Sequence, residues 1–369
     1  MNAEDQSKNP KKKLSVPLLI AAGLAALAVL SVITVAVLWL TGRSKIERQP
    51  TSVITIQEAE PSSEAPQEEE APAASEAVPE PVHDEMLETY TIRRNGKLYR
   101  QKQNVKTFLL LGVDRKITDD LTGVEYPSDA HADVLMLVVL DFDTNRMSML
   151  AVPRDTMCEM DTFDKDANPT GSGFGQIALS FRYGDGALKS CALTAKAVSD
   201  LLYNIPISGT AALYLDGIHA VNDAVGGVTL TPLISTGSLV AGQETTLTGQ
   251  QAEEYIRERE HTEYGNLQRM EQQKQYFIAL LVQAAAKARE KPSSILELYH
   301  AVSDYVVTDL TPNEITYLAS QVLLMNFNGD ISTLPGEIRL SEDNYAEYHL
   351  DEKAVADRLT ELYFDEVES

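Results

Sequence analysis

The chain has 369 residues, of which 44% are apolar and 23% are charged. This composition is typical of a globular protein, and the length exceeds that of one small domain. The formal net charge of −24 is a poor fit to a nucleic-acid-binding protein, which needs a basic face, so we predict no nucleic-acid partner. The two cysteines and six histidines show no metal-ligand spacing, which argues against zinc chemistry.

An uncharged apolar run extends from Val16 to Leu40. At 1.5 Å per residue a helix of this length spans ~37 Å, enough to cross a ~30 Å hydrocarbon core with some tilt. A cleaved signal peptide is the alternative, but its apolar region is only ~7–15 residues long and ends at small residues. Lysines at 8 and 11–13 precede the run, a slight bias that favours an N-terminus inside the cell. We therefore predict a cytoplasmic tail at residues 1–14, a single-pass transmembrane anchor helix at 15–41 and a main domain outside the cell membrane.

A long acidic tract follows the apolar run. From Gln49 to Ile92 there is no Lys or Arg, and Glu, Pro, Ala and Ser dominate. Such a segment cannot bury enough apolar surface to offset its ordering entropy, and its like charges extend it. We predict a disordered acidic linker at residues 42–86 and an extracytoplasmic domain at 87–369. Within this domain we expect a core at about 104–290 and a C-terminal extension at about 291–369.

The first elements of the domain are predicted as strands. An Asn95-Gly96 dipeptide between alternating polar and apolar residues predicts a tight hairpin. Continuous apolar runs predict buried strands at Phe108–Val113, Val134–Phe142 and Met147–Val152. Because the loop between the last two runs is short, this pair should be antiparallel. Asp133 and Arg154 then lie opposite each other at one edge of the sheet.

Apolar residues at helical spacing predict helices in the rest of the chain. A capping-box pattern at Thr248–Gln251 marks the start of one helix, and Gly226-Gly227 ends another. The predicted helices are Ala192–Tyr203, Ile218–Val225, one beginning at Thr248, Leu267–Glu290, Pro312–Met325 and Glu352–Tyr363, with further strands at Val228–Pro232 and Ile331–Leu334. Because strands alternate with helices, the predicted fold class is α/β, with a mixed sheet between helices.

The two cysteines, Cys158 and Cys191, both fall in the predicted extracytoplasmic part. They could form a disulfide there, because such compartments are oxidising. Two free thiols are the alternative, since spacing alone does not show that the two Cα atoms lie within ~7 Å.

Two aspartates occupy the ends of predicted strands. Asp114 follows the first buried strand, and Asp133 precedes the second. They could share Mg²⁺ (or Mn²⁺), which is typically held by one or two carboxylates together with phosphate oxygens and water. The alternative is an ordinary pair of turn or cap aspartates. We interpret His131 as a surface or hydrogen-bonded histidine rather than a ligand.

Further cations lie around the start of the longest predicted helix. Arg269 and Gln273 share a face near its N-terminus, where free backbone N–H groups favour an anion. Arg257 and Arg259 point the same way only in an extended segment, so for both to serve one ligand the preceding helix must end near Tyr255. These groups predict a diphosphate site, because a charge pair ~4 Å apart is worth about 4 kcal/mol at an effective dielectric near 20. The alternative is a solvated face on which the arginines pair with neighbouring glutamates.

Six segments occur in a specific order and spacing between about Phe108 and Gln275: FLLLGVD, HAD, LAVPRDT, AVGGV, LTGQQAEEYIRER and NLQRMEQQ. In that order and spacing they resemble the LytR-CpsA-Psr family of cell-wall glycopolymer transferases. The resemblance implies an α-β-α sandwich with a hydrophobic tunnel for a polyprenyl chain. It also implies that a muramic acid C6 hydroxyl attacks the polymer-bearing phosphate of a polyprenyl diphosphate and releases polyprenyl phosphate.

The resemblance also implies roles for individual residues. The implied catalytic residues are Asp114, Asp133, Arg154 and Arg259, and the implied Mg²⁺ ligands are Asp114 and Asp133. The implied diphosphate-binding residues are Arg154, Arg257, Arg259, Arg269 and Gln273. Charge neutralisation on the leaving group would lower the barrier of such a transfer.

The chain departs from the family pattern at three positions. His131 and Gln272 stand where arginines are usual, and Asn266 stands where an aspartate is usual. Asn266 cannot act as a base, so another group must do so if the family's aspartate accepts the acceptor's proton. We predict a membrane-anchored, Mg-dependent phosphotransferase that attaches a polyprenyl-diphosphate-linked anionic glycopolymer, teichoic-acid-like or capsular, to peptidoglycan. The alternatives are a non-catalytic lipid-linked-polymer binder that regulates envelope assembly, and a polyprenyl-diphosphate hydrolase.

Overall fold

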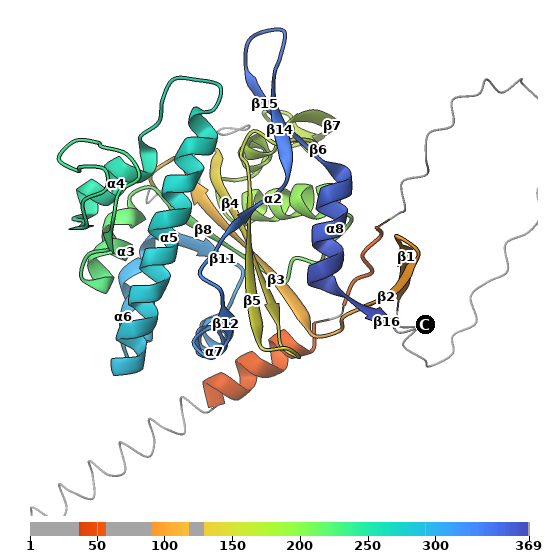
Figure 1. Cartoon of the computed structure of the whole chain (residues 1–369), viewed down its shortest axis with the longest axis horizontal. Helices are drawn as coiled ribbons and strands as arrows, with labels where there is room; N and C mark the ends of the chain where they lie inside the picture. Colours follow the sequence, from red (N-terminus) through yellow and green to blue (C-terminus); the bar gives the residue numbers. More distant parts are fainter. Residues whose placement is uncertain (1–36, 50, 57–89, 118–128, 292, 368–369) are drawn as a thin grey trace, which may run out of the picture.

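The computed structural model describes residues 37–49, 51–56, 90–117, 129–291 and 293–367. Its centre is a seven-stranded mixed sheet with the order β11-β8-β3-β4-β5-β12, in which β13 also pairs with β5 (Figure 1). The strands are β3 (Val105–Val113), β4 (Ala132–Asp141), β5 (Arg146–Val152), β8 (Gly209–Tyr214), β11 (Val306–Thr308), β12 (Asn326–Phe327) and β13 (Ser332–Thr333). Strand β3 is parallel to β8 and antiparallel to β4, which is antiparallel to β5. The C-terminal ends of β3, β5 and β8 therefore meet the start of β4 at one edge of the sheet.

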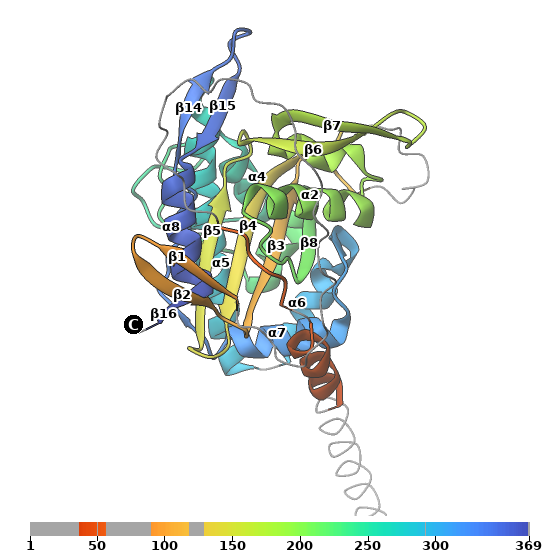
Figure 2. The ribbon, with the colours of Figure 1, turned by 90° about the vertical axis from the view of Figure 1, so that its right-hand side faces the viewer.

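Helices cover both faces of this sheet, so the predicted α/β class is confirmed (Figure 1, Figure 2). Helices α2 (Leu188–Leu201) and α8 (Glu352–Tyr363) cover one face, whereas α5 (Gly265–Glu290), α6 (Ser294–Val302) and α7 (Pro312–Val322) cover the other. Successive side chains of a strand point to opposite faces. Leu109 and Leu111 of β3 accordingly pack with the α2 and α8 side, and Phe108 packs with the α5 and α7 side.

Smaller elements surround these layers. Strands β1 (Thr91–Arg94), β2 (Lys97–Gln101) and β16 (Phe364–Val367) form a three-stranded sheet. Two-stranded pairs are β6 (Met157–Phe163) with β7 (Pro169–Gln176), β9 (Thr229–Leu230) with β10 (Thr245–Thr246), and β14 (Gly336–Leu340) with β15 (Ala346–Leu350). The other short helices are α3 (Gly217–Val225), α4 (Gly249–Arg257), η2 (Ile177–Tyr183) and η3 (Ser303–Tyr305).

Elements with a local signal are confirmed. Asn95 and Gly96 have φ values of 50° and 76° and join β1 to β2 in a tight hairpin. Thr248 forms the predicted capping box that starts α4, and Gly226, at φ 93°, ends α3. The β6–β7 hairpin is not predicted from the sequence, because β7 is glycine-rich and mostly exposed and so lacks the apolar run of a buried strand.

The region after residue 291 belongs to the same folded unit as the predicted core, so the expected boundary at 290 is wrong. Strand β11 pairs with β8, and β12 and β13 pair with β5. Val355 and Leu359 of α8 are buried in the same hydrophobic cluster as α2. The predicted extension therefore completes the central sheet and covers one of its faces.

The predicted linker at residues 42–86 is wrong at its beginning. Residues 37–47 form a helix, and residues 51–56 pack against the domain. Ile46 and Ile54 are fully buried. These isoleucines supply the apolar surface that offsets ordering entropy, which the acidic residues after them lack.

The predicted anchor at residues 15–41 lies outside the described residues except for 37–41, which are helical. The predicted tail at 1–14 and the linker beyond residue 56 up to 86 also lie outside them. Within the described ranges, no helix combines the length and the apolar character that crossing a membrane requires.

Cys158 and Cys191 are buried and do not form a disulfide. The alternative of two free thiols is therefore the correct one. Burial raises the pKa of each thiol to about 12. Both side chains therefore stay protonated near neutral pH and pack as small apolar groups.

Candidate functional site

Charged side chains gather at the sheet edge where β3 and β5 end and β4 begins. Asp114 directly follows β3, Asp133 is the second residue of β4, and Arg154 lies shortly after β5. Helix α5 starts beside them and contributes Arg269 from its second turn. Four segments that are distant in sequence thus supply one cluster of charges.

Asp133 holds two arginines in this cluster. Its Oδ1 contacts Nη1 of Arg154, and its Oδ2 lies 3.0 Å from Nη1 of Arg269. The side chains of Arg154 and Arg269 are only 17% and 9% exposed, so salt screens these ion pairs little. The contact confirms that the β4–β5 hairpin, in which Leu135 pairs with Val152, places Asp133 opposite Arg154.

Two donors of these arginines are buried and have no hydrogen-bond partner among the described residues. They are Nε of Arg154 and Nη2 of Arg269. An unpaired buried donor costs ~1–3 kcal/mol, and more when the group is charged. Burial also lowers the pKa of the Arg269 guanidinium, although Asp133 opposes this. Nε of Arg154 lies 3.4 Å from Oδ1 of Asp155 without a hydrogen bond, so two carboxylates already face the two arginines. An oxyanion bound between the arginines would supply the missing hydrogen-bond acceptors.

Asp114 and His131 bind each other across the ends of β3 and β4. The backbone N–H of His131 donates to Oδ1 of Asp114 at 2.8 Å, and the ring Nδ1 lies 3.2 Å from Oδ2. Burial alone would raise the pKa of the Asp114 carboxyl, but the hydrogen bonds from His131 and the charge of Arg154 outweigh it and hold the pKa below its ordinary value. Asp114 is therefore ionised at neutral pH, and His131 is hydrogen-bonded, as predicted.

The two aspartates have the acceptor capacity that a divalent cation needs. A carboxylate oxygen can accept two bonds, and each oxygen of Asp114 and Asp133 has one protein partner in the described structure. No group of three or more His, Cys, Asp or Glu side chains that could hold a metal occurs in the described part of the chain. A magnesium ion here would therefore rely on these carboxylates together with phosphate oxygens and water, which is its usual mode of binding.

A chain of hydrogen bonds connects Arg259 to Asp155 through Asn266. Nη1 of Arg259 donates to Oδ1 of Asn266 at 2.7 Å, and Nδ2 of Asn266 donates to Oδ2 of Asp155 at 2.7 Å. Asp155 is buried, which raises its carboxyl pKa even though the Asn266 bond and the charges of Arg154 and Arg269 lower it. The sequence prediction did not include Asp155 among the site residues. In the sequence, the only indication of its role is that it directly follows Arg154.

Gln272 and Gln273 hold the end of α4 against α5. Nε2 of Gln272 donates to the carbonyl oxygen of Tyr255 at 2.6 Å, and Nε2 of Gln273 donates to that of Ile256 at 3.2 Å. Gln273 also lines a small hollow beside Asp133, as a substrate-binding residue should. The hydrogen bond that its amide donates, however, goes to the end of α4 rather than to that hollow. Gln272 is fully buried and has a structural role.

Arg257 and Arg259 have different surroundings, because α4 ends between them. Arg257 is the last residue of α4, and its Nη1 lies 2.9 Å from Oε1 of Glu253. The backbone becomes extended at Glu258, with ψ 133°, and this turns Arg259 toward Asn266. The structure therefore brings Arg259 to the charged cluster. Arg257, whose side chain is 59% exposed, instead pairs with Glu253, which matches the alternative that the arginines pair with neighbouring glutamates on a solvated face.

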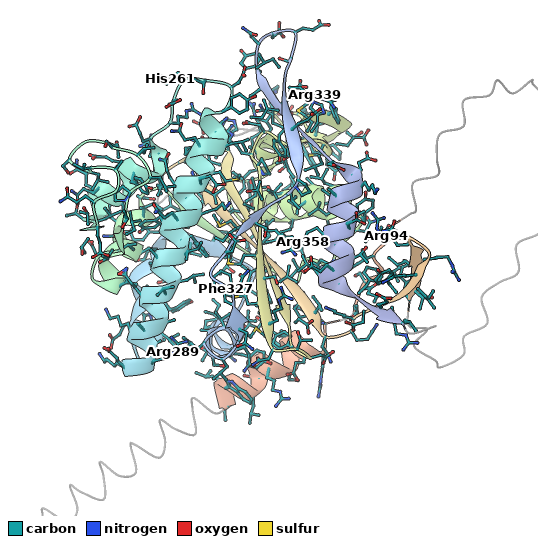
Figure 3. All side chains as sticks on the ribbon, in the orientation of Figure 1. Arg94, His261, Arg289, Phe327, Arg339 and Arg358 are labelled. Atoms are coloured by element: carbon teal, nitrogen blue, oxygen red, sulfur yellow. The ribbon has the colours of Figure 1, made fainter. Side chains whose placement is uncertain are left out.

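An apolar cavity of ≈ 510 Å³ lies between the sheet and helices α5, α6 and α7. Its walls include Phe108, Leu110, Val138, Leu140, Met147 and Met149 of the sheet, Phe277, Leu281, Ala284 and Ala285 of α5, Ile295 and Leu298 of α6, and Leu318 and Val322 of α7. Figure 3 shows the direction of α5, which runs from the end near His261 to the end that carries Arg289. The charged cluster lies beside the first turns of α5, and the cavity follows along its later turns. Val198 of α2, in contrast, belongs to the closed core on the opposite face.

The sequence profile of the LytR_cpsA_psr family matches residues 63–363. The chain belongs to this family. A relative from Oceanobacillus iheyensis, named polyisoprenyl-teichoic acid–peptidoglycan teichoic acid transferase TagU, is 31% identical over 240 residues. That match covers 63% of this chain and 66% of the relative. The family resemblance seen in the sequence motifs is thus confirmed.

Solved structures of LytR_cpsA_psr type share the fold. B. subtilis TagV superposes with a TM-score of 0.55 and 25% identity, covering 70% of this chain and 97% of TagV. A structure of TagT bound to LIIa-WTA superposes with a TM-score of 0.52 and 17% identity, covering 70% of this chain and 89% of TagT. The described segments at residues 37–49 and 51–56 precede the family match, although they pack against the domain.

Proposed function

We propose that this LytR_cpsA_psr protein is a phosphotransferase that attaches a polyprenyl-diphosphate-linked anionic glycopolymer to the muramic acid of peptidoglycan. The observation that carries the proposal is the sequence of features along α5, where paired buried arginines are followed by an apolar cavity. A polyprenyl diphosphate has the same division, with a charged diphosphate joined to a long apolar tail. The names of the TagU relative and of the TagT complex support a teichoic-acid-like polymer, and a capsular one has the same chemistry at the linkage.

The cavity is the proposed binding site of the lipid tail. Burial of apolar surface is worth ~25 cal/mol per Å², so a tail needs apolar walls rather than specific contacts. Lys287 is the charged residue in the lining, and its Nζ donates to the carbonyl oxygen of Ala224 at 2.6 Å. The ammonium group of Lys287 is thereby bound by a backbone oxygen, and the methylene chain of the same residue contributes apolar surface to the cavity wall.

The diphosphate is the proposed ligand of the arginine cluster. Arg154 and Arg269 offer buried donors that have no hydrogen-bond partner among the described residues. Arg259 is linked to the same cluster because Asn266, which accepts its hydrogen bond, donates to Asp155. Arg257 would contact the diphosphate after its ion pair with Glu253 breaks. Charge that develops on the departing polyprenyl phosphate is then neutralised by fixed cations in a site of low dielectric, where such interactions are strongest.

We also propose that Asp114 and Asp133 hold Mg²⁺ (or Mn²⁺) together with oxygens of the diphosphate. Their acceptor capacity supports this assignment. When bound, the ion would neutralise further charge on the diphosphate. Asp133 would in addition keep Arg154 and Arg269 in place, because it contacts both.

The acceptor hydroxyl must lose a proton as its oxygen attacks phosphorus. Asn266 cannot take that proton, so we assign it to the carboxylate of Asp155, which Asn266 orients. Burial raises the pKa of Asp155 and makes it a stronger base than an exposed aspartate. The new bond joins the acceptor oxygen to the polymer-bearing phosphorus, and the bond from that phosphorus to the polyprenyl phosphate breaks.

The proposed location is the outer face of the cell membrane, with a single-pass helix and the N-terminus inside. The support is the uncharged run up to Leu40, which enters the helix of residues 37–47. Peptidoglycan and lipid-linked polymer are both reachable from that side.

The test uses the full chain in lipid vesicles with a short-chain polyprenyl-diphosphate sugar, Mg²⁺ and a peptidoglycan oligomer, and reads the products by mass spectrometry. We expect a phosphodiester-linked sugar on the glycan. Arg269→Ala should reduce this product by ~10²–10³-fold. Arg339→Ala, which removes an exposed arginine paired with Glu337, should leave it unchanged. Binding without turnover would replace the transferase with a lipid-polymer binder, and release of a free sugar phosphate would replace it with a hydrolase.

A further inference from the structure

The helix formed by residues 37–47, here called the docking helix, packs along α7. Nε1 of Trp39 donates to Oγ of Ser320 at 2.9 Å, and the hydroxyl of Tyr317 donates to Oε1 of Glu47 at 2.9 Å. The rings of Trp39 and Tyr317 also meet edge to face, with centroids 5.5 Å apart. Specific contacts therefore hold the docking helix near both of its ends.

Close packing adds to these contacts. A Cβ atom at Gly42 would collide with the carbonyl oxygen of Asn313, so the two backbones approach as closely as glycine allows. Ile46 is fully buried in the cluster that also contains Tyr317. Just beyond the end of the docking helix, Nζ of Lys106 donates to the carbonyl oxygen of Gln49 at 2.7 Å, and a cation at this position suits the helix dipole.

Helix α7 stands between the docking helix and the lipid cavity. Tyr317 and Ser320 face the docking helix, whereas Leu318 and Val322 line the cavity. The docking helix therefore supports the wall of the proposed lipid site from outside.

The chain order leaves no free tether between the predicted anchor and the domain. The anchor, predicted at residues 15–41, shares its last residues with the docking helix. The chain then packs against the domain through residues 51–56, and the acidic tract comes only after these. An acidic segment in that position does not separate the domain from the membrane.

We propose that the end of the domain formed by the docking helix, α7 and the end of α5 rests on the lipid bilayer, with the charged cluster facing away from it. This inference rests on the proposed anchoring. Figure 1 and Figure 2 both place the docking helix and α7 at one end of the molecule and the β14–β15 hairpin at the other. Leu40 and Leu324 are 56% and 69% exposed near this end, and Lys45 and Arg48 are exposed after the anchor. Exposed apolar side chains beside basic ones suit a surface of anionic lipid.

The orientation specifies how the lipid substrate is held. Helix α5 ends at Glu290, 21 residues after Arg269, so about 30 Å of helix separates the charged cluster from the end that rests on the bilayer. The tail would then enter the cavity from the bilayer end, beside α7, and the diphosphate would be presented toward the cell wall.

The test measures energy transfer from the full chain to an acceptor lipid in phosphatidylcholine and phosphatidylglycerol vesicles. The donor is attached at Leu324→Cys, just after α7, or at Tyr345→Cys, in the turn between β14 and β15. Both native side chains are 69% exposed, and α7 and the β14–β15 hairpin lie at opposite ends of the molecule (Figure 1). The native thiols are buried and stay unlabelled. We expect transfer from position 324 to be several-fold higher than from position 345. Equal transfer from chains that float with the vesicles would overturn the orientation, whereas chains that do not float would overturn the anchoring.

Variants of the docking helix test the cause of the orientation. Gly42→Leu forces the helix off Asn313, and Trp39→Ala removes the contacts with Ser320 and Tyr317. Both should reduce the difference between the two label positions, and Trp39→Ala serves as the test if Gly42→Leu does not fold. Glu159→Leu, an exposed change on β6, should leave the difference intact. A difference that persists in a folded Trp39→Ala variant would contradict docking.

Discussion

The two faces of the central sheet use the same strands but are packed differently. Toward α2 and α8 the interior is closed, and Leu109, Leu111 and Leu137 are at most 3% exposed. Toward α5, α6 and α7 the same strands line a cavity of ≈ 510 Å³. Ordinary protein cores contain few voids larger than a water molecule, and an empty cavity lowers stability. The comparison indicates that the second face is shaped for a ligand, and the charged cluster lies along the helix that covers that face.

Removal of a buried cation from the charged cluster should have the largest effect of the changes considered, and the quantity affected is turnover. Arg269→Ala takes away a guanidinium with an unused donor but leaves Asp133 paired with Arg154, so the fold should persist. We expect turnover to fall by ~10²–10³-fold, which is typical for loss of one donor to developing charge. Steady-state kinetics with a polyprenyl-diphosphate sugar would measure this, and Arg339→Ala is the exposed control. Turnover unchanged in Arg269→Ala would remove the arginine cluster from the reaction.

The next effect concerns proton transfer. Asp155→Asn keeps the shape of the side chain but removes the base, so we expect turnover to fall by ~10²-fold or more. The stability of the folded variant, in contrast, should not fall at pH 7. A carboxyl whose pKa is raised on folding destabilises the folded state above its unfolded pKa of ~4, because the folded chain holds the proton more tightly. The variant should therefore be at least as stable as the parent at pH 7, and its advantage should fade as the pH falls toward 4.

Thermal unfolding at both pH values, alongside the kinetics, separates these two effects. Asp166→Asn, which changes an exposed aspartate, is the control. A large loss of stability in Asp155→Asn at pH 7 would show that the carboxylate is structural rather than a base.

The same large residue placed on each face should give opposite results. Ala285→Phe on α5 fills part of the cavity, so we expect weaker binding of a fluorescent polyprenyl phosphate with little loss of stability. Ala356→Phe on α8 enters the closed core, and overpacking there should cost ~1–3 kcal/mol in urea unfolding without a direct effect on the lipid site. Equal destabilisation by the two changes would mean that the cavity is not open space.

The smallest effect concerns the closed face. Cys158 and Cys191 have thiol pKa values raised to about 12 by burial, so they should react with iodoacetamide only after unfolding. Intact-mass measurement before and after addition of denaturant would count the modified thiols. Modification of the native protein at pH 8 would show that the α2 side opens readily.

Local signals explain most of what could be predicted. The Asn95-Gly96 turn, the capping box at Thr248 and the glycine stop at Gly226 each depend on a few neighbouring residues. The pairing of Asp133 with Arg154 was also predictable, because a short hairpin determines which residues face each other.

Contacts between distant segments were not predictable in the same way. The bond from Asn266 to Asp155 joins residues 111 positions apart, and the bond from Trp39 to Ser320 joins residues 281 apart. The sequence also left open whether Arg257 would meet the ligand or a glutamate. The exact end of α4 decided this, since it turned Arg259 toward the cluster and left Arg257 beside Glu253.

By itself, the sequence determined the buried strands β3, β4 and β5, several of the helices, the family, and the charges at the strand ends, because these follow from local periodicity and motif spacing. Only the tertiary structure decided which face of the sheet stays open, that Asp155 joins the site, and that residues 37–49 and 51–56 belong to the domain. These features depend on how α5, α7 and the docking helix pack together, and the free energy of packing is shared among residues that no local pattern connects.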